Sequence, residues 1–203
     1  MELLRAGMGK EGVEAFVRAM EIKPDLVSEL IDLLTIPSAL SPPERKHRTT
    51  QAQKASWVIR HIAAEHPASL TKHHTRLHAM LDKVEDESAL RELLKALSEP
   101  ELRALESQAQ TNDLALLGCG FMEAEGVSVA LTYLGMQLVE DRLGKSTEVS
   151  MSDAIRSLDN LLNRKSVEAP GAPLMRAAKK RRSRWAVKIS RAQNRRSAAE
   201  SPK

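Results

Sequence analysis

Basic residues recur on one face of the predicted C-terminal helix. Six of them are spaced by four, four, four, three and four residues: Arg176, Lys180, Arg184, Lys188, Arg191 and Arg195. Residues three or four apart on a helix are neighbours, with Cβ atoms about 5–6 Å apart, so the six form a continuous ridge of positive charge. The apolar residues of the segment fall on the other side: Leu174, Ala178, Trp185 and Ile189. Such a ridge can follow the phosphates of a nucleic acid, with an affinity that depends strongly on salt and little on base sequence.

The charge distribution leaves three kinds of partner open for this ridge. Residues 171–203 carry eleven Lys or Arg and one acid, a net charge of +10, whereas residues 1–170 carry 20 bases and 26 acids, a net charge of −6. This asymmetry predicts an anionic partner. The partner is a nucleic acid in one interpretation and a membrane surface in another. In the third it is acidic protein, either a separate molecule or the acidic part of this same chain.

A second candidate site lies in the predicted helix of residues 51–65. Trp57 is followed within two turns by Arg60, His61 and Glu65. In a groove, an aromatic ring beside these groups can hold a stacked base or an arginine-rich peptide. The competing interpretation is that Trp57 fills the gap between helices, since large aromatic side chains mostly serve packing. We favour packing and expect Trp57 to be mostly buried.

Two smaller constellations could also carry chemistry. His74, His78 and Asp82 are spaced by four residues, so two imidazoles and a carboxylate could approach one metal ion. Asp82, however, is turned about 80° from His74 on a helical wheel and follows the expected helix end, so we predict no metal site. Cys119 has no base or cation adjacent in the sequence, and we expect a buried, inert thiol.

The sequence lacks the common signatures of catalysis. It contains no Walker A loop, GxGxxG, GxSxG, HExxH or kinase signature. We therefore predict a non-catalytic protein with no catalytic residue and no cofactor. The single cysteine cannot form an intramolecular disulfide, which favours the reducing cytoplasm. No uncharged apolar run reaches about 18 residues, so we expect no transmembrane segment. The oligomeric state stays open.

The composition predicts an all-α fold that positions these residues. Only five residues are aromatic, and the strong helix formers Leu, Ala, Met, Glu, Lys and Arg are abundant. Apolar residues recur at helical spacing and predict helices at 11–21, 24–36, 51–65, 67–81, 90–97, 101–110, 126–143, 152–163 and from 174 onward. The segment 38–48 contains Pro42 and Pro43 and is expected to be a polar connection. The helix at 126–143 is apolar on two sides, which is typical of a helix between neighbours.

These elements suggest four parts. We expect an N-terminal helical pair and linker at 1–48, a helical core at 49–166, a linker at 167–173 and a basic C-terminal helix and tail at 174–203. Helices with only one or two apolar stripes must bury them against neighbours, as in helical solenoids and bundles alike. The sequence shows no clean repeat period.

Residues 54–67 (KASWVIRHIAAEHP) resemble the repeat core of uncharacterised bacterial HEAT-like proteins, which place a Trp in the first helix of a pair and His-Pro at the turn into the second. Residues 88–97 and 126–136 resemble later repeat helices, so that the similarity covers roughly residues 50–165. The resemblance implies a short HEAT-like stack of helix pairs. We expect the acidic part of the chain to bind a protein or peptide in a groove.

The same architecture is used by DNA repair glycosylases that act on alkylated bases, which is the enzyme alternative. That alternative requires a basic groove with an aromatic residue and an acid, and no glycosylase catalytic acid matches a motif here. The negative net charge of residues 1–170 also disfavours it.

Overall fold

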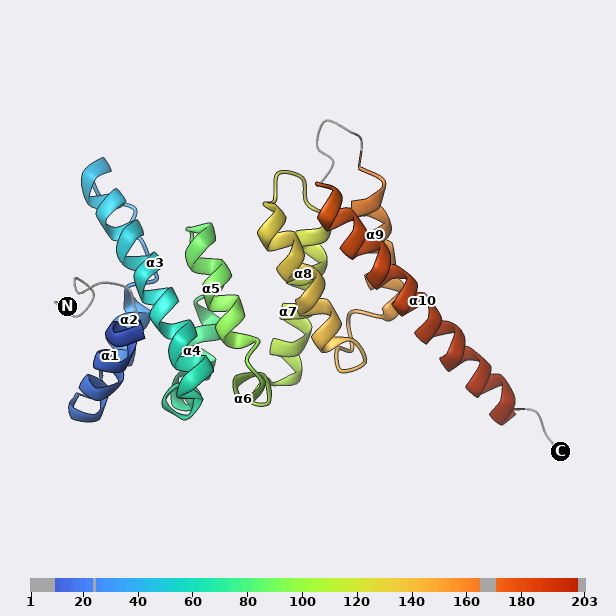
Figure 1. Cartoon of the computed structure of the whole chain (residues 1–203), viewed down its shortest axis with the longest axis horizontal. Coiled ribbons are helices and arrows are strands. Elements are labelled where there is room, and N and C mark those ends of the chain that lie inside the picture. Colours follow the sequence, from blue (N-terminus) through green and yellow to red (C-terminus); the bar gives the residue numbers. More distant parts are fainter. Residues whose placement is uncertain (1–9, 24, 165–170, 201–203) are drawn as a thin grey trace. The chain divides into compact units, whose positions relative to one another are not determined.

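The computed structural model describes the backbone of residues 10–23, 25–164 and 171–200, and the side chains of these residues except 10, 11, 13, 21 and 192–200. Throughout this part of the chain, all regular secondary structure is helical and no strand occurs (Figure 1). The predicted all-α fold is therefore confirmed. No helix among the described residues is long and apolar enough to cross a membrane.

The chain forms two compact units, residues 1–106 and 107–203. The first contains α1 (Lys10–Ile22), α2 (Leu26–Asp32), α3 (Pro42–Glu65), the 3-10 helix η2 (Pro67–His73), α4 (His74–Ala79), α5 (Glu87–Leu97) and α6 (Pro100–Arg103). The second contains α7 (Gln108–Glu123), α8 (Val129–Arg142), α9 (Met151–Leu162) and α10 (Ala172–Glu200). The boundary falls inside the range 49–166 that the sequence suggested as one core.

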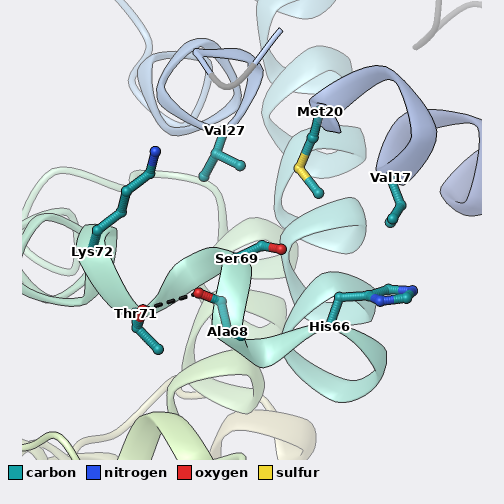
Figure 2. Close-up of a pocket in the computed structure, with 8 residues that line it drawn as sticks. All are labelled: Val17, Met20, Val27, His66, Ala68, Ser69, Thr71 and Lys72. Atoms are coloured by element: carbon teal, nitrogen blue, oxygen red, sulfur yellow. Dashed lines mark hydrogen bonds between the residues drawn. The ribbon is translucent and has the colours of Figure 1, made fainter. Parts of the chain in front are cut away.

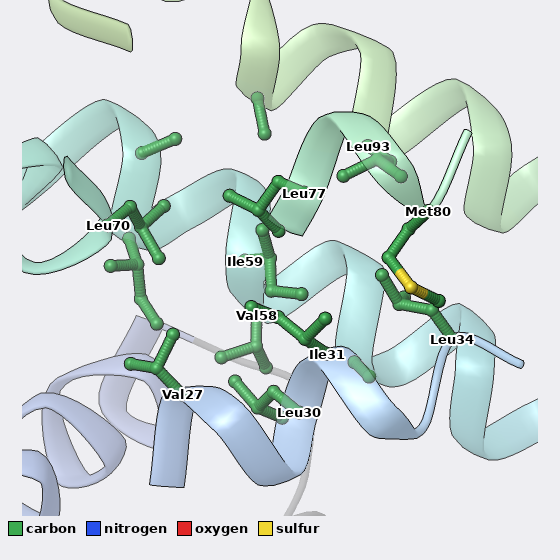
Figure 3. Close-up of a cluster of buried hydrophobic side chains, with 14 of the residues drawn as sticks. Val27, Leu30, Ile31, Leu34, Val58, Ile59, Leu70, Leu77, Met80 and Leu93 are labelled. Atoms are coloured by element: carbon green, nitrogen blue, oxygen red, sulfur yellow. The ribbon is translucent and has the colours of Figure 1, made fainter. Parts of the chain in front are cut away.

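The first unit is held together by a single apolar cluster. Figure 3 shows side chains of the α2 region, α3, η2, α4 and α5 meeting there, among them Ile31, Ile59, Leu70, Leu77 and Leu93. All five are fully buried. Burying a Leu or Ile side chain stabilises a fold by about 1.5–3 kcal/mol, so this cluster fixes α3 against α5 and η2.

Helix α3 begins nine residues earlier than the sequence predicted. The expected polar connection at 38–48 is wrong from Pro42 onward, because Pro42 and Pro43 occupy the first turn of α3. Proline is tolerated there, since the first-turn N–H groups have no intrahelical acceptor. Ser41 is the N-cap, and its N–H donates to Glu44 Oε2 at 3.0 Å. This capping box starts the helix.

The predicted helix at 101–110 is also wrong, because the boundary between the units lies within it. Helix α6 ends at Arg103, and α7 begins at Gln108. Ser107 caps α7 by accepting a hydrogen bond from the Gln110 N–H at 3.2 Å. The polar residues of this stretch therefore separate two helices instead of forming the outer face of one.

In the second unit, α7 and α8 approach each other through two glycines. A Cβ added at Gly118 would lie 2.7 Å from the Gly135 carbonyl oxygen, and one at Gly135 would lie 2.7 Å from the Gly118 carbonyl oxygen. Only glycine permits this approach. Gly144 follows α8 with φ of +85°, the left-handed conformation that favours glycine after a helix end.

Candidate anion-binding face of helix α10

One side of α10 is buried in the core of the second unit. Leu174, Ala178 and Trp185 are 1%, 0% and 0% exposed and share a cluster with Leu158 and Leu161 of α9. This confirms three of the four residues of the predicted apolar side, whereas the fourth, Ile189, is only partly buried. Figure 1 shows α10 running along α9 and continuing past it. The N-terminal half of α10 is therefore an integral part of the unit.

Three arginines join α10 to acids on its neighbours. Glu140 of α8 pairs with Arg181 Nε at 3.1 Å and with an Arg184 terminal nitrogen at 2.7 Å. Asp159 of α9 pairs with Arg182. Part of the positive charge of α10 is therefore paired with acidic residues of the same chain, as one of the three interpretations expected. Arg184, one of the six ridge residues, is engaged in these pairs although its side chain is half exposed.

The remaining described cations of α10 face solvent. Five are exposed: Arg176, Lys179, Lys180, Lys188 and Arg191. Within the part of the chain whose side chains are described, none of the five forms an ion pair. Arg195 lies in the helix, but its side chain is outside the described residues. The sequence from 171 to 191 contains no Asp or Glu, so the exposed side of this segment carries positive charge alone.

The five exposed cations extend along most of the described helix. At a rise of 1.5 Å per residue, Arg176 and Arg191 are about 22 Å apart along the axis. The buried side chains hold the backbone between Leu174 and Trp185, which carries Arg176, Lys179 and Lys180, whereas Lys188 and Arg191 follow the last buried residue of the helix. This arrangement can hold an extended polyanion by charge, and it offers no exposed aromatic ring, because Trp185 is fully buried.

The structure brings Trp57, Arg60 and His61 together on α3, but their groups are already engaged. Trp57 is partly buried and packs against the core of the first unit. Its ring centroid lies 4.1 Å from that of His61, which covers part of the indole. Arg60 pairs with Glu92 of α5 at 3.4 Å. These contacts favour the packing role of Trp57.

Glu92 is a buried carboxylate that the sequence did not single out. It is 8% exposed and accepts hydrogen bonds from Lys95 at 2.8 Å and Arg91 at 3.2 Å. Burial alone would raise the pKa of Glu92, but these hydrogen bonds and the charges of Lys95 and Arg60 hold it below its usual value. The position of Glu92 in the sequence did not indicate that it would be buried. Its burial and its pairing with Arg60 depend on how α5 packs against α3.

Of the two histidines, His74 is buried and His78 is partly buried. The rings of His74 and His78 meet edge to face with centroids 4.6 Å apart, whereas Asp82 is exposed and lies beyond the end of α4. In the described ranges, no group of three His, Cys, Asp or Glu side chains is placed to hold a metal ion. Burial lowers the pKa of His74, which favours its neutral form.

Cys119 is buried in α7. Burial raises the pKa of its thiol above the usual value. A thiolate is the reactive form of cysteine, so a raised pKa makes this side chain a poor nucleophile. The packing interpretation of Cys119 agrees with this environment.

Comparisons with known proteins assign neither a family nor a function to the chain. The chain matches no protein-family model, and neither the curated proteins nor the solved structures gave a match. The resemblance to HEAT-like proteins therefore stays a prediction, and any function has to be argued from the geometry of the chain itself.

Proposed function

We propose that this protein is a non-catalytic binding protein whose helix α10 contacts the phosphate backbone of a nucleic acid. One observation carries the proposal: the cations of α10 fall into a group that is paired within the unit and a group that is exposed and unpaired among the described side chains. Arg181, Arg182 and Arg184 pair with acids of the same unit, whereas the five exposed cations defined above are left without an acid among the described side chains. An internal role accounts for the first group and leaves the second available for a partner.

A nucleic acid fits the exposed cations because its charge is continuous and evenly spaced. Duplex DNA carries one negative charge per about 1.7 Å of its axis, so a row of cations extending over about 22 Å meets several phosphates. Lys and Arg contacts to phosphates position a protein without reading the bases. We therefore expect binding to be largely independent of sequence.

The absence of an exposed aromatic ring on the described part of α10 also predicts the form of nucleic acid. Proteins specialised for single strands stack bases on aromatic side chains, each worth about 1–3 kcal/mol. The one aromatic residue of α10 is Trp185, and it is buried. We expect duplexes to bind at least as tightly as single strands of the same length.

The test compares two variants that lose the same charge from different places. In the first, four exposed ridge residues are replaced by Gln: Arg176, Lys180, Lys188 and Arg191. In the matched control, four exposed cations elsewhere are replaced by Gln: Arg18, Lys46, Lys83 and Lys145. Binding to a labelled duplex is measured by gel shift at low salt. We expect the ridge variant to lose most of its affinity and the control to keep most of it.

Truncation of α10 is not a clean test, because it removes Trp185 and its neighbours from the core together with the cations. The Gln variants avoid this, since every substituted side chain is exposed. Equal losses in the two variants would show that net charge alone drives binding. Absence of binding to both DNA and RNA at low salt would refute the proposal. Capture of an acidic protein that persists after nuclease treatment would indicate the other class of partner.

A further inference from the structure

A pocket of about 440 Å³ lies in the first unit between α1, α2 and η2. Figure 2 shows Val17, Met20 and Val27 along one side of it and Ala68, Ser69 and Thr71 along the other. Small-molecule sites in proteins have volumes of roughly 300–1,000 Å³ and combine apolar walls with a few polar groups. The pocket has both features.

The apolar side of the pocket is well shielded. Met20 is 8% exposed and Val27 is 2% exposed, and Val17 is partly buried against the same core. These three side chains come from two different helices, α1 and α2. They supply a surface suited to an aliphatic chain, and they contain no hydrogen-bonding group that would require a polar ligand at this side.

The polar groups that line the pocket belong to His66, Ser69, Thr71 and Lys72. The Thr71 hydroxyl donates to the Ala68 carbonyl at 2.9 Å, so it is already used. Among the described residues, neither the Ser69 hydroxyl nor the Lys72 ammonium has a hydrogen-bond or ion-pair partner. Figure 2 shows Lys72 extending toward the helix that carries Val27. The Lys72 ammonium, the Ser69 hydroxyl and the His66 imidazole therefore border a mainly apolar wall.

We propose that this pocket binds a linear amphipathic carboxylate. The carboxylate accepts a hydrogen bond from Ser69 Oγ and pairs with Lys72 Nζ, and its alkyl chain contacts Val17, Met20 and Val27. The single ammonium matches a single negative charge, which favours a monocarboxylate over a polyanion. The site lies in the first unit and does not depend on the proposed function of α10.

The experiment uses the full chain and decanoate as the probe, followed by isothermal titration calorimetry below the concentration at which decanoate forms micelles. We expect saturable binding of one decanoate per chain. Octanoate should bind about 15-fold more weakly, since each buried methylene changes affinity about fourfold. Acetate should not bind.

Two charge variants separate the proposed head-group contact from a general effect of charge. Lys72→Gln should weaken decanoate binding about two- to fivefold, since an ion pair to an exposed lysine is lost. Lys83→Gln removes a comparable exposed charge from the same unit and should leave binding unchanged. Decanamide, which has the chain without the charge, should bind both variants equally.

A third variant tests whether the alkyl chain of decanoate lies in this pocket. Ser69→Phe places a ring in the pocket and should abolish decanoate binding while circular dichroism shows an unchanged helical content. Absence of saturable decanoate binding to the full chain would overturn the proposal. So would an equal effect of the two Lys variants, or undiminished binding to folded Ser69→Phe.

Discussion

Replacing Trp185 by Ala should undock α10 from the second unit. Trp185 is fully buried and belongs to the same cluster as Leu158, Leu161 and Leu174. Truncating a buried Trp to Ala costs about 3–5 kcal/mol, because the fold loses the apolar burial of the side chain and is left with a cavity. Small domains have a free energy of unfolding of about 5–15 kcal/mol, so the change removes a large share of the stability.

Trp185→Phe provides the graded comparison. In the described structure, the Trp185 Nε1 atom is buried without a hydrogen-bond partner. A buried, unsatisfied donor costs about 1–3 kcal/mol, and Phe removes that cost while it keeps most of the apolar contact. We expect Trp185→Phe to lower the free energy of unfolding by less than half as much as Trp185→Ala.

Thermal melts followed by circular dichroism measure both changes. For a unit the size of residues 107–203, each kcal/mol shifts Tm by about 4–8 °C, so Trp185→Ala should lower Tm by at least about 12 °C. In a Trp57→Phe background, Trp185 is the single tryptophan and its emission reports directly on the docking of α10. An unchanged Tm in Trp185→Ala, or a solvent-exposed emission spectrum for Trp185, would refute the docked helix.

Two further predictions follow from packing and burial. Gly118→Ala should destabilise the second unit by about 1–3 kcal/mol, because its Cβ would meet the Gly135 carbonyl oxygen at 2.7 Å. Gly120→Ala should instead stabilise it by up to about 1 kcal/mol, since a Cβ there meets nothing within 4 Å and Ala favours helix; denaturant melts should show opposite signs. Burial lowers the pKa of His74 below its ordinary value near 6.5, so the unfolded chain takes up that proton first, and stability should decrease as pH falls below about 6.5. Melts between about pH 7 and pH 5 should show a smaller decrease for His74→Gln, and an identical pH profile would contradict this.

The apolar side of α10 could be predicted from the sequence, because the helical repeat of about 3.6 residues decides which side chains share a face. The apolar side, with Leu174, Ala178 and Trp185, is where the spacing placed it. The period did not reveal that Arg184 pairs with Glu140. That pairing depends on how α8 lies against α10, and such a contact between distant segments leaves no trace in local spacing.

The prediction for the start of α3 was wrong because of its two prolines. Pro42 and Pro43 indicate a break when read alone, but after Ser41, and with Glu44 two residues beyond Pro42, they form the first turn of a capped helix. The capping box was present in the sequence and could have been used. Glu92 offered no comparable signal, because its burial arises from the pairing of α5 with Arg60 of α3.

The salt dependence of nucleic-acid binding tests the central claim most directly. Anisotropy of a labelled duplex is titrated with the full chain at several salt concentrations. If the five exposed cations of α10 each neutralise one phosphate, log K should fall with log salt concentration with a slope of roughly −4.5. Replacing Arg176, Lys180, Lys188 and Arg191 by Gln should reduce that slope to roughly −1. A slope that is the same in the variant and the unmodified chain, or no binding at low salt, would contradict the account.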